Sequence, residues 1–193
     1  MSIEDFAASI AASLAAAATP AEVAAPPVPA ERLSLRERVS RRLGTADMLV
    51  FRVAGELFAV ELVAVEEALD MPIVHRLPEM PPAMLGVFTL RGLLVSVFSP
   101  EETLGVAYQD AATVVVFCGG ERRIALAADD VDDVLLADLT TVRDAPGSST
   151  KDGALLGVVR RGADLIAVLD AQSLLAAHRS VAASVSDVVK ETV

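Results

Sequence analysis

Few side chains in this chain of 193 residues could do chemistry. It has two histidines, His75 and His178, and one cysteine, Cys118. Zinc sites and nucleophilic sites combine several such residues, and Gly-rich phosphate loops and the G-x-S-x-G motif do not occur in the sequence. We therefore predict a protein that is not an enzyme and that uses no metal and no cofactor. We expect both histidines on the surface or beside a helix, and Cys118 as a small core residue within an apolar run.

Four closely spaced acids form the second candidate group: Asp129, Asp130, Asp132 and Asp133. Carboxylate oxygens are ligands for divalent cations, but the glycine-containing spacing of a calcium loop is missing. We interpret the segment as a strand end that runs into a turn with solvated Asp side chains. A metal-dependent enzyme that uses these carboxylates is the alternative, and calorimetry with Mg²⁺ or Ca²⁺ would test it.

The third candidate is Arg91, which lies between two apolar segments and precedes a glycine. A guanidinium group at such a position can present its planar set of donors to a carboxylate on a partner. It can equally form an internal pair with Glu66 or Glu67. The residue pattern alone leaves the two interpretations open.

Charge excludes some classes of partner. The chain has 16 Lys and Arg against 27 Asp and Glu, a formal net charge of −11. Nucleic acid and anionic lipid need clustered cations, so neither is expected as the main partner. No apolar stretch reaches the roughly 18 residues of a membrane span, and Glu4 and Asp5 occupy the place of a basic leader region. We expect a cytoplasmic protein without membrane insertion.

Helical patterns are confined to the two ends of the chain. Residues 1–46 are interpreted as an extension with an amphipathic helix over 2–18 and a proline-rich linker over 20–30. A short helix follows, capped by Ser34 and Glu37 and ended by Gly44. Its solvent side is expected to carry four arginines: Arg36, Arg38, Arg41 and Arg42. After Asp170, a C-terminal helix is predicted over 171–193 and is expected to pack on the preceding domain.

The middle of the chain has the pattern of strands. Apolar runs occupy 48–53, 57–62, 87–98, 113–118, 124–128 and 155–169, with glycine turns at 54–56 and 119–121. The order of features repeats: Leu85-Gly86-Val87 before Arg91-Gly92 corresponds to Leu156-Gly157-Val158 before Arg161-Gly162. This repeat predicts two related β subdomains, about 47–108 and 109–170, in which barrel closure would remove exposed sheet edges.

Together these segments resemble the CheW-like domain family of chemotaxis coupling modules, from about Met48 to Leu175. The resemblance is carried, in order, by Phe58-Ala59-Val60, Val65-Glu66-Glu67, Leu77-Pro78, Gly86-Val87-Phe88-Thr89-Leu90-Arg91-Gly92, Asp129-Asp130-Val131-Asp132-Asp133-Val134-Leu135 and Leu165-Ile166-Ala167-Val168-Leu169-Asp170. It implies a mainly β fold of two intertwined five-stranded SH3-like barrels with flanking helices, in a domain at 47–175.

The resemblance also implies a function and its residues. A CheW-like protein is expected to be a non-enzymatic scaffold that joins methyl-accepting chemoreceptor cytoplasmic tips to the regulatory domain of a CheA-type histidine kinase, in membrane-associated clusters. Matched by position, the kinase-binding residues would be Val65 and Glu66. The receptor-binding residues would be Glu67, Arg91, Leu94 and Val114.

Two departures from the family pattern support an alternative. Thr89 replaces the family asparagine before Leu90-Arg91-Gly92, and the segment 97–101 lacks the usual Asp and Arg. Together with the extension at 1–46, they suggest a divergent CheW-like regulator of another kinase or of a polar-localisation factor, recruited through the N-terminal helix.

Overall fold

The computed structural model describes residues 33–109, 111–118, 123–145, 153–176 and 178. The predicted helix at 2–18, the linker at 20–30, the glycine turn at 119–121 and most of the predicted C-terminal helix lie outside these residues. Within them, no helix is long and apolar enough to cross a membrane.

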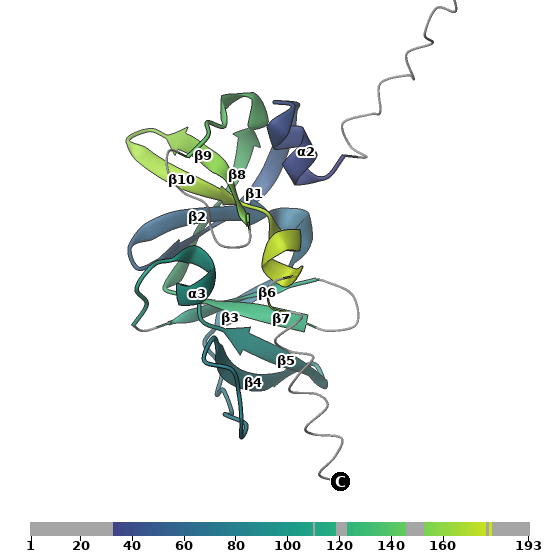
Figure 1. The fold of residues 1–193 in the computed structure, drawn as a ribbon, viewed down its shortest axis with the longest axis vertical. Helices are drawn as coiled ribbons and strands as arrows, with labels where there is room; N and C mark the ends of the chain where they lie inside the picture. The colour runs from purple at the N-terminus through teal and green to yellow at the C-terminus, as the bar shows by residue number, and fades with distance from the viewer. Residues whose placement is uncertain (1–32, 110, 119–122, 146–152, 177, 179–193) are drawn as a thin grey trace, which may run out of the picture.

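The described residues form two five-stranded sheets, stacked one above the other in Figure 1. The first sheet has the order β8-β1-β2-β10-β9, with bounds Thr45–Val53 (β1), Glu56–Glu61 (β2), Asp130–Asp138 (β8), Leu155–Arg161 (β9) and Asp164–Leu169 (β10). The second has the order β3-β6-β7-β5-β4, with bounds Val65–Asp70 (β3), Met84–Leu90 (β4), Leu93–Phe98 (β5), Thr113–Phe117 (β6) and Arg123–Ala128 (β7). The mainly β, SH3-like architecture is confirmed.

Each sheet takes strands from both halves of the chain. β10 pairs in parallel with β2 in the first sheet, and β7 pairs in parallel with β5 in the second, so each half contributes to the sheet of the other. The sequence repeat divides the chain near residue 108, whereas the sheets exchange strands across that point. The two subdomains are therefore intertwined.

Strand alternation builds three cores. Met48, Val50 and their neighbours fill the interior of the first sheet, and Val95, Val114 and their neighbours fill that of the second. The opposite face of many of the same strands packs into a third core between the sheets, which includes Phe51. A strand with one core on each face has apolar residues in succession, as β6 does after Thr113, and all five of its residues are buried.

The repeated Leu-Gly-Val segments have a common structural role. In the second sheet, His75 forms a two-way backbone bridge with Val87, which joins the segment after edge strand β3 to the opposite edge strand β4. In the first sheet, Arg143 and Val158 form the equivalent bridge between the segment after β8 and β9. These bridges satisfy polar groups that an open edge would expose.

The glycine before each bridge makes the close backbone approach possible. A Cβ atom on Gly86 would lie 2.6 Å from the His75 carbonyl oxygen, and one on Gly157 would lie 2.5 Å from that of Arg143. Both glycines also have positive φ angles, 153° and 157°. The repeat in the sequence therefore reflects a backbone contact that only glycine accommodates.

Short helical segments pack around the sheets: α2 (Leu35–Ser40), α3 (Glu101–Leu104) and the 3-10 turns η2 (Leu62–Ala64) and η3 (Leu139–Thr141). α2 begins with the predicted capping box of Ser34 and Glu37, but it ends at Ser40, before Gly44. The helix at 171–176 follows Asp170, whose carboxylate accepts a hydrogen bond from the Gln172 backbone, and lies between the two sheets in Figure 1.

α2 belongs to the folded body. Leu35 is buried in the core of the first sheet. The expectation that the arginines at 36–42 face solvent is wrong for Arg38, whose side chain is only 14% exposed, whereas Arg36 is exposed and also forms an ion pair. Arg36 donates to Asp170 at 3.0 Å, and Arg38 donates to Glu61 at 2.7 Å. These contacts attach the helix to the rest of the domain.

Three further predictions are corrected. The acidic segment is not a strand end that enters a turn, because residues 130–138 form the long edge strand β8. Cys118 is exposed at the end of β6 and is not a core residue. His178 is buried, with Nε2 2.8 Å from the Thr103 hydroxyl and its ring stacked on Phe98, because residues after Asp170 fold back against α3.

Candidate functional surface

Arg91 is held in a tight turn at one end of the second sheet. β4 ends at Leu90 and β5 begins at Leu93, so Arg91 and Gly92 form a two-residue hairpin loop. Their φ angles are 50° and 80°, and two consecutive positive φ angles are characteristic of a type I′ turn. Arginine is an unfavourable residue at the first of these positions, where asparagine, aspartate or glycine is preferred. A strained residue at an exposed position is a reason to look for a function.

The geometry of Arg91 is compatible with both interpretations, an internal ion pair and a contact with a carboxylate of a partner. Its Nη2 donates to Glu67 Oε2 at 2.8 Å, so an internal pair is present. The arginine side chain nevertheless keeps 68% of its surface exposed, and that of Glu67 keeps 31%. An exposed pair of this kind contributes about 0–1 kcal/mol to stability, so a competing carboxylate can replace Glu67 at low cost.

Glu66 occupies a β-bulge in edge strand β3. Val65 pairs with Phe117 and Glu67 pairs with Val116, which leaves Glu66 without an opposite residue on β6. Its carboxylate accepts a hydrogen bond of 2.5 Å from Arg123 Nε, and this bond raises the pKa of Arg123. The sequence analysis missed Arg123, because β6 lies between β3 and β7 and only the register brings it to Glu66.

Val65 and Leu94 have different degrees of exposure. Val65 is half-buried at the start of β3 and packs against the core between the sheets. Leu94 lies three residues after Arg91 and exposes 62% of its surface. Leu93, beside it, exposes 46%. The hairpin end therefore combines a guanidinium group with two exposed leucine side chains.

Val114 differs from the other predicted contact residues. It is 0% exposed and belongs to the interior core of the second sheet, opposite Leu69 of β3. Its side chain has no surface for a receptor in this structure, because both faces of β6 are covered. The prediction that Val114 contacts a receptor directly is therefore corrected: Val114 lies on β6, beside β3, and supports that strand from the core.

The acidic segment is engaged by arginines. Asp132 accepts hydrogen bonds from Arg161 at 2.6 Å and from Arg52 at 3.0 Å. These bonds, that from Arg161 first, hold the pKa of the Asp132 carboxyl below its usual value. Arg161 lies on edge strand β9 and Asp132 on edge strand β8, so this pair joins the two edges of the first sheet. The described residues contain no group of three or more His, Cys, Asp and Glu arranged to hold a metal ion.

Comparisons with known proteins agree with this architecture. Residues 47–179 match the family model of the CheW-like domain. The chemotaxis protein CheW of Klebsiella aerogenes is 26% identical over 137 residues, covering 68% of this chain and 82% of the relative. The chemotaxis protein CheW of Bacillus subtilis is 23% identical over 133 residues, covering 66% and 85%.

A solved structure gives the same result for the fold. The scaffolding protein TtCheW of Thermoanaerobacter tengcongensis superposes with a TM-score of 0.58 at 21% identity, covering 65% of this chain and 89% of that one. The family model spans well over half of the chain, and the matched residues contain β2 to β10 and all of β1 except its first two residues. This chain belongs to the CheW-like domain family.

Proposed function

We propose that this chain is a chemotaxis adaptor that couples the cytoplasmic tips of methyl-accepting chemoreceptors to the regulatory domain of a CheA-type histidine kinase in receptor clusters. Family membership supports the class of function. The observation that carries the residue assignment is the exposed, strained Arg91 beside Leu94, with Glu67 as an exchangeable partner. The adaptor acts by holding two proteins in a defined geometry.

The receptor contact is assigned to Glu67, Arg91 and Leu94. A receptor helix that presents a carboxylate would exchange with Glu67 for Arg91, and an apolar side chain beside it would cover Leu94. Charge pairing would set the register of the helix, and apolar burial would supply most of the affinity. Val114 contributes indirectly, because it pairs with Leu69 on the strand that carries Glu67 and shares a core with it.

The kinase contact is assigned to the start of β3, at Val65 and Glu66. β3 is an edge strand of the second sheet, Val65 and Glu66 are both half-buried, and the bulge at Glu66 changes the direction of the side chains. Arg123 holds the Glu66 carboxylate and thereby orders this edge before binding. The kinase residues and Glu67 of the receptor contact are thus neighbours on β3, whereas Arg91 and Leu94 belong to the β4–β5 hairpin.

Separate binding measurements test both contacts. We expect Arg91→Asn to weaken binding to a soluble receptor fragment by about tenfold and to leave affinity for the kinase regulatory domain unchanged, because asparagine fits the turn but lacks the charge. Val65→Thr should weaken kinase binding more than receptor binding. Ala54→Asn is the matched control, because Ala54 and Gly55 form the same type of turn in the first sheet. Unchanged receptor affinity of Arg91→Asn would refute the receptor assignment.

Removal of residues 1–32 tests the alternative of a dedicated regulator. The cut must spare α2, whose Leu35 and Arg36 are packed into the domain. Equal kinase binding by the full chain and the shortened chain supports a coupling adaptor. Kinase binding that is lost on truncation would instead support recruitment through the N-terminal extension.

A further inference from the structure

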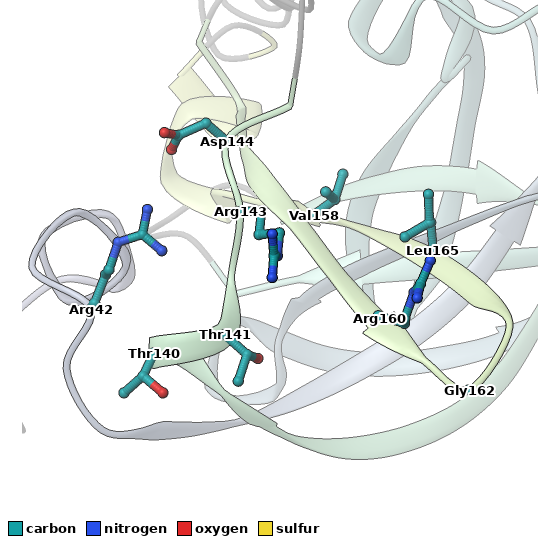
Figure 2. A pocket seen from close by; sticks show the side chains of 9 residues that line it. All are labelled: Arg42, Thr140, Thr141, Arg143, Asp144, Val158, Arg160, Gly162 and Leu165. Atoms are coloured by element: carbon teal, nitrogen blue, oxygen red, sulfur yellow. The ribbon is translucent and has the colours of Figure 1, made fainter.

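A second surface with unusual charge lies on the first sheet, away from the proposed kinase and receptor contacts. It is an open hollow of about 1190 Å³, here called the arginine hollow, lined by Arg42, Thr140, Thr141, Arg143, Asp144, Val158, Arg160, Gly162 and Leu165. Figure 2 shows that these side chains come from three parts of the chain: the end of α2, the segment that follows β8, and the β9–β10 hairpin.

Its three arginines are exceptional in this acidic protein. Among the described residues, six other arginines have a carboxylate within 4.0 Å. Arg42, Arg143 and Arg160 have none, and the only described arginines that share this property are Arg41 and Arg76. In a chain with a net charge of −11, unpaired guanidinium groups are thus concentrated at one place.

The position of these arginines is set by the backbone. Arg143 exchanges two backbone hydrogen bonds with Val158, at 2.9 and 2.7 Å, and Gly157 permits the close approach. Arg160 follows on the same strand, two residues after Val158. Arg42 Nη1 donates to the Val142 carbonyl at 2.8 Å, which anchors its side chain beside this segment. The three arginines are therefore held in place by hydrogen bonds of, or to, the backbone.

The other polar groups of the hollow are already used. The backbone N–H and the hydroxyl of Thr140 both donate to the Asp138 carboxylate, at 2.9 and 2.8 Å, and the Thr141 hydroxyl donates to the Asp138 carbonyl at 2.7 Å. A phosphate site normally adds such hydroxyl and backbone donors to its cations. Here the hydroxyl groups of Thr140 and Thr141 are engaged, so the guanidinium groups are the hydrogen-bond donors available to a ligand. Asp144 is the one acidic residue among those that line the hollow.

An apolar strip borders the arginines. Leu165 exposes 59% of its surface, and Val158 is half-buried. A small inorganic anion would leave this strip uncovered and would fill little of the hollow. An extended peptide with two carboxylates and an apolar side chain at alternate positions fits both the charge and the strip, because residues i, i+2 and i+4 of an extended chain point to the same side, and Leu165 lies opposite Arg160 in the β9–β10 pair.

We propose that the arginine hollow binds a short acidic segment of a partner protein, in which carboxylates pair with Arg143 and Arg160 and an apolar side chain packs on Leu165. Guanidinium groups bind carboxylates through two parallel hydrogen bonds, which gives the contact its orientation. Asp144 opposes binding through its like charge. The site is separate from the surface formed by β3 and the β4–β5 hairpin.

Fluorescence anisotropy with the full chain tests the proposal. The probe is a fluorescein-labelled twelve-residue peptide of repeated Gly-Glu-Gly-Glu-Gly-Leu, which places its glutamates and leucines on one side of an extended chain, and its counterpart with glutamine in place of glutamate is the ligand control. We expect the glutamate peptide to bind and the glutamine peptide not to bind, with weaker binding at higher salt. Arg160→Glu should weaken binding by about tenfold and Asp144→Asn should strengthen it.

Arg76→Glu is the matched control for Arg160→Glu. It makes the same change in net charge at an exposed, unpaired arginine outside the hollow. Circular dichroism and thermal melting verify that each variant is folded. An equal loss in both variants would mean bulk electrostatics and would overturn the proposal. So would the absence of peptide binding, or an Arg160-dependent site for pyrophosphate that the peptide does not occupy.

Discussion

At the scale of single residues, strain and charge identify Arg91 more clearly than its type does. A non-glycine residue with a φ angle of 50° in a type I′ turn lowers the stability of the fold, and the exposed ion pair with Glu67 offsets only part of this loss. Ala54 has the same strain, at a φ angle of 51°, without a charged side chain. Comparison of the two turns therefore separates the destabilisation caused by the positive φ angle from the binding role of the Arg91 side chain.

We predict that Ala54→Asn raises the free energy of unfolding by about 1 kcal/mol, because asparagine tolerates the left-handed region better than alanine does. Chemical denaturation at neutral pH measures this change. A decrease in stability would show that the turn does not have the conformation described here.

Asp132 gives a prediction about pH. Its folded-state pKa is lowered by Arg161 and Arg52, so ionised Asp132 stabilises the fold at neutral pH, and this contribution is lost as the pH falls through and below the ordinary value of 3.8. Asp132→Asn should therefore lower the melting temperature at pH 7 and should make it less sensitive to acid. Melting curves between pH 7 and pH 3 provide the measurement. Parallel curves for the two proteins would contradict the prediction.

At the scale of elements, the glycine before each backbone bridge decides whether the sheet edges can join. Gly86 and Gly157 stand at equivalent places in the repeat, and each would carry a Cβ atom in collision with a carbonyl oxygen. The sequence repeat is therefore explained by a repeated contact between segments that are distant along the chain.

Gly157→Ala is expected to lower the free energy of unfolding by more than about 2 kcal/mol, because the Cβ atom meets backbone that cannot rotate away. Gly162→Ala is the control for the loss of a glycine with positive φ, since nothing lies within 4 Å of its Cβ position. Urea unfolding of both variants tests the difference. Equal losses would mean that φ alone, and not the close approach, requires glycine at residue 157.

At the scale of the whole molecule, the exchange of strands makes the two sheets one cooperative unit. Phe51 of the first sheet and Phe98 of the second pack in the same core between the sheets. β10 can pair with β2 only when the chain has already passed through the second sheet, so neither sheet is complete without both halves of the chain.

We predict that Phe51→Ala lowers the free energy of unfolding by about 3–5 kcal/mol and does so equally for amides of both sheets. Native-state hydrogen exchange measures this free energy for the buried strands β2 and β6 separately. A loss confined to β2 would show that the two sheets unfold independently.

The sequence by itself determined the elements whose signals are local. The capping box at Ser34, the apolar strands and the glycine turn at residue 55 all depend on neighbouring residues. The internal repeat predicted two related β subdomains, and the resemblance to the CheW-like family implied that they are SH3-like. β8 was misinterpreted because acidic side chains on the exposed face of an edge strand resemble a turn.

The tertiary structure alone decided which residues are accessible and which charges meet. Val114 and Cys118 lie in the same apolar run, yet Val114 is buried in the core of the second sheet and Cys118 is exposed at the end of β6. The register and bulge of β3 bring Glu66 to Arg123, and the β4–β5 hairpin brings Arg91 to Glu67 from the opposite edge of the sheet. Burial and ion pairing depend on segments far apart along the chain, so local patterns do not contain them.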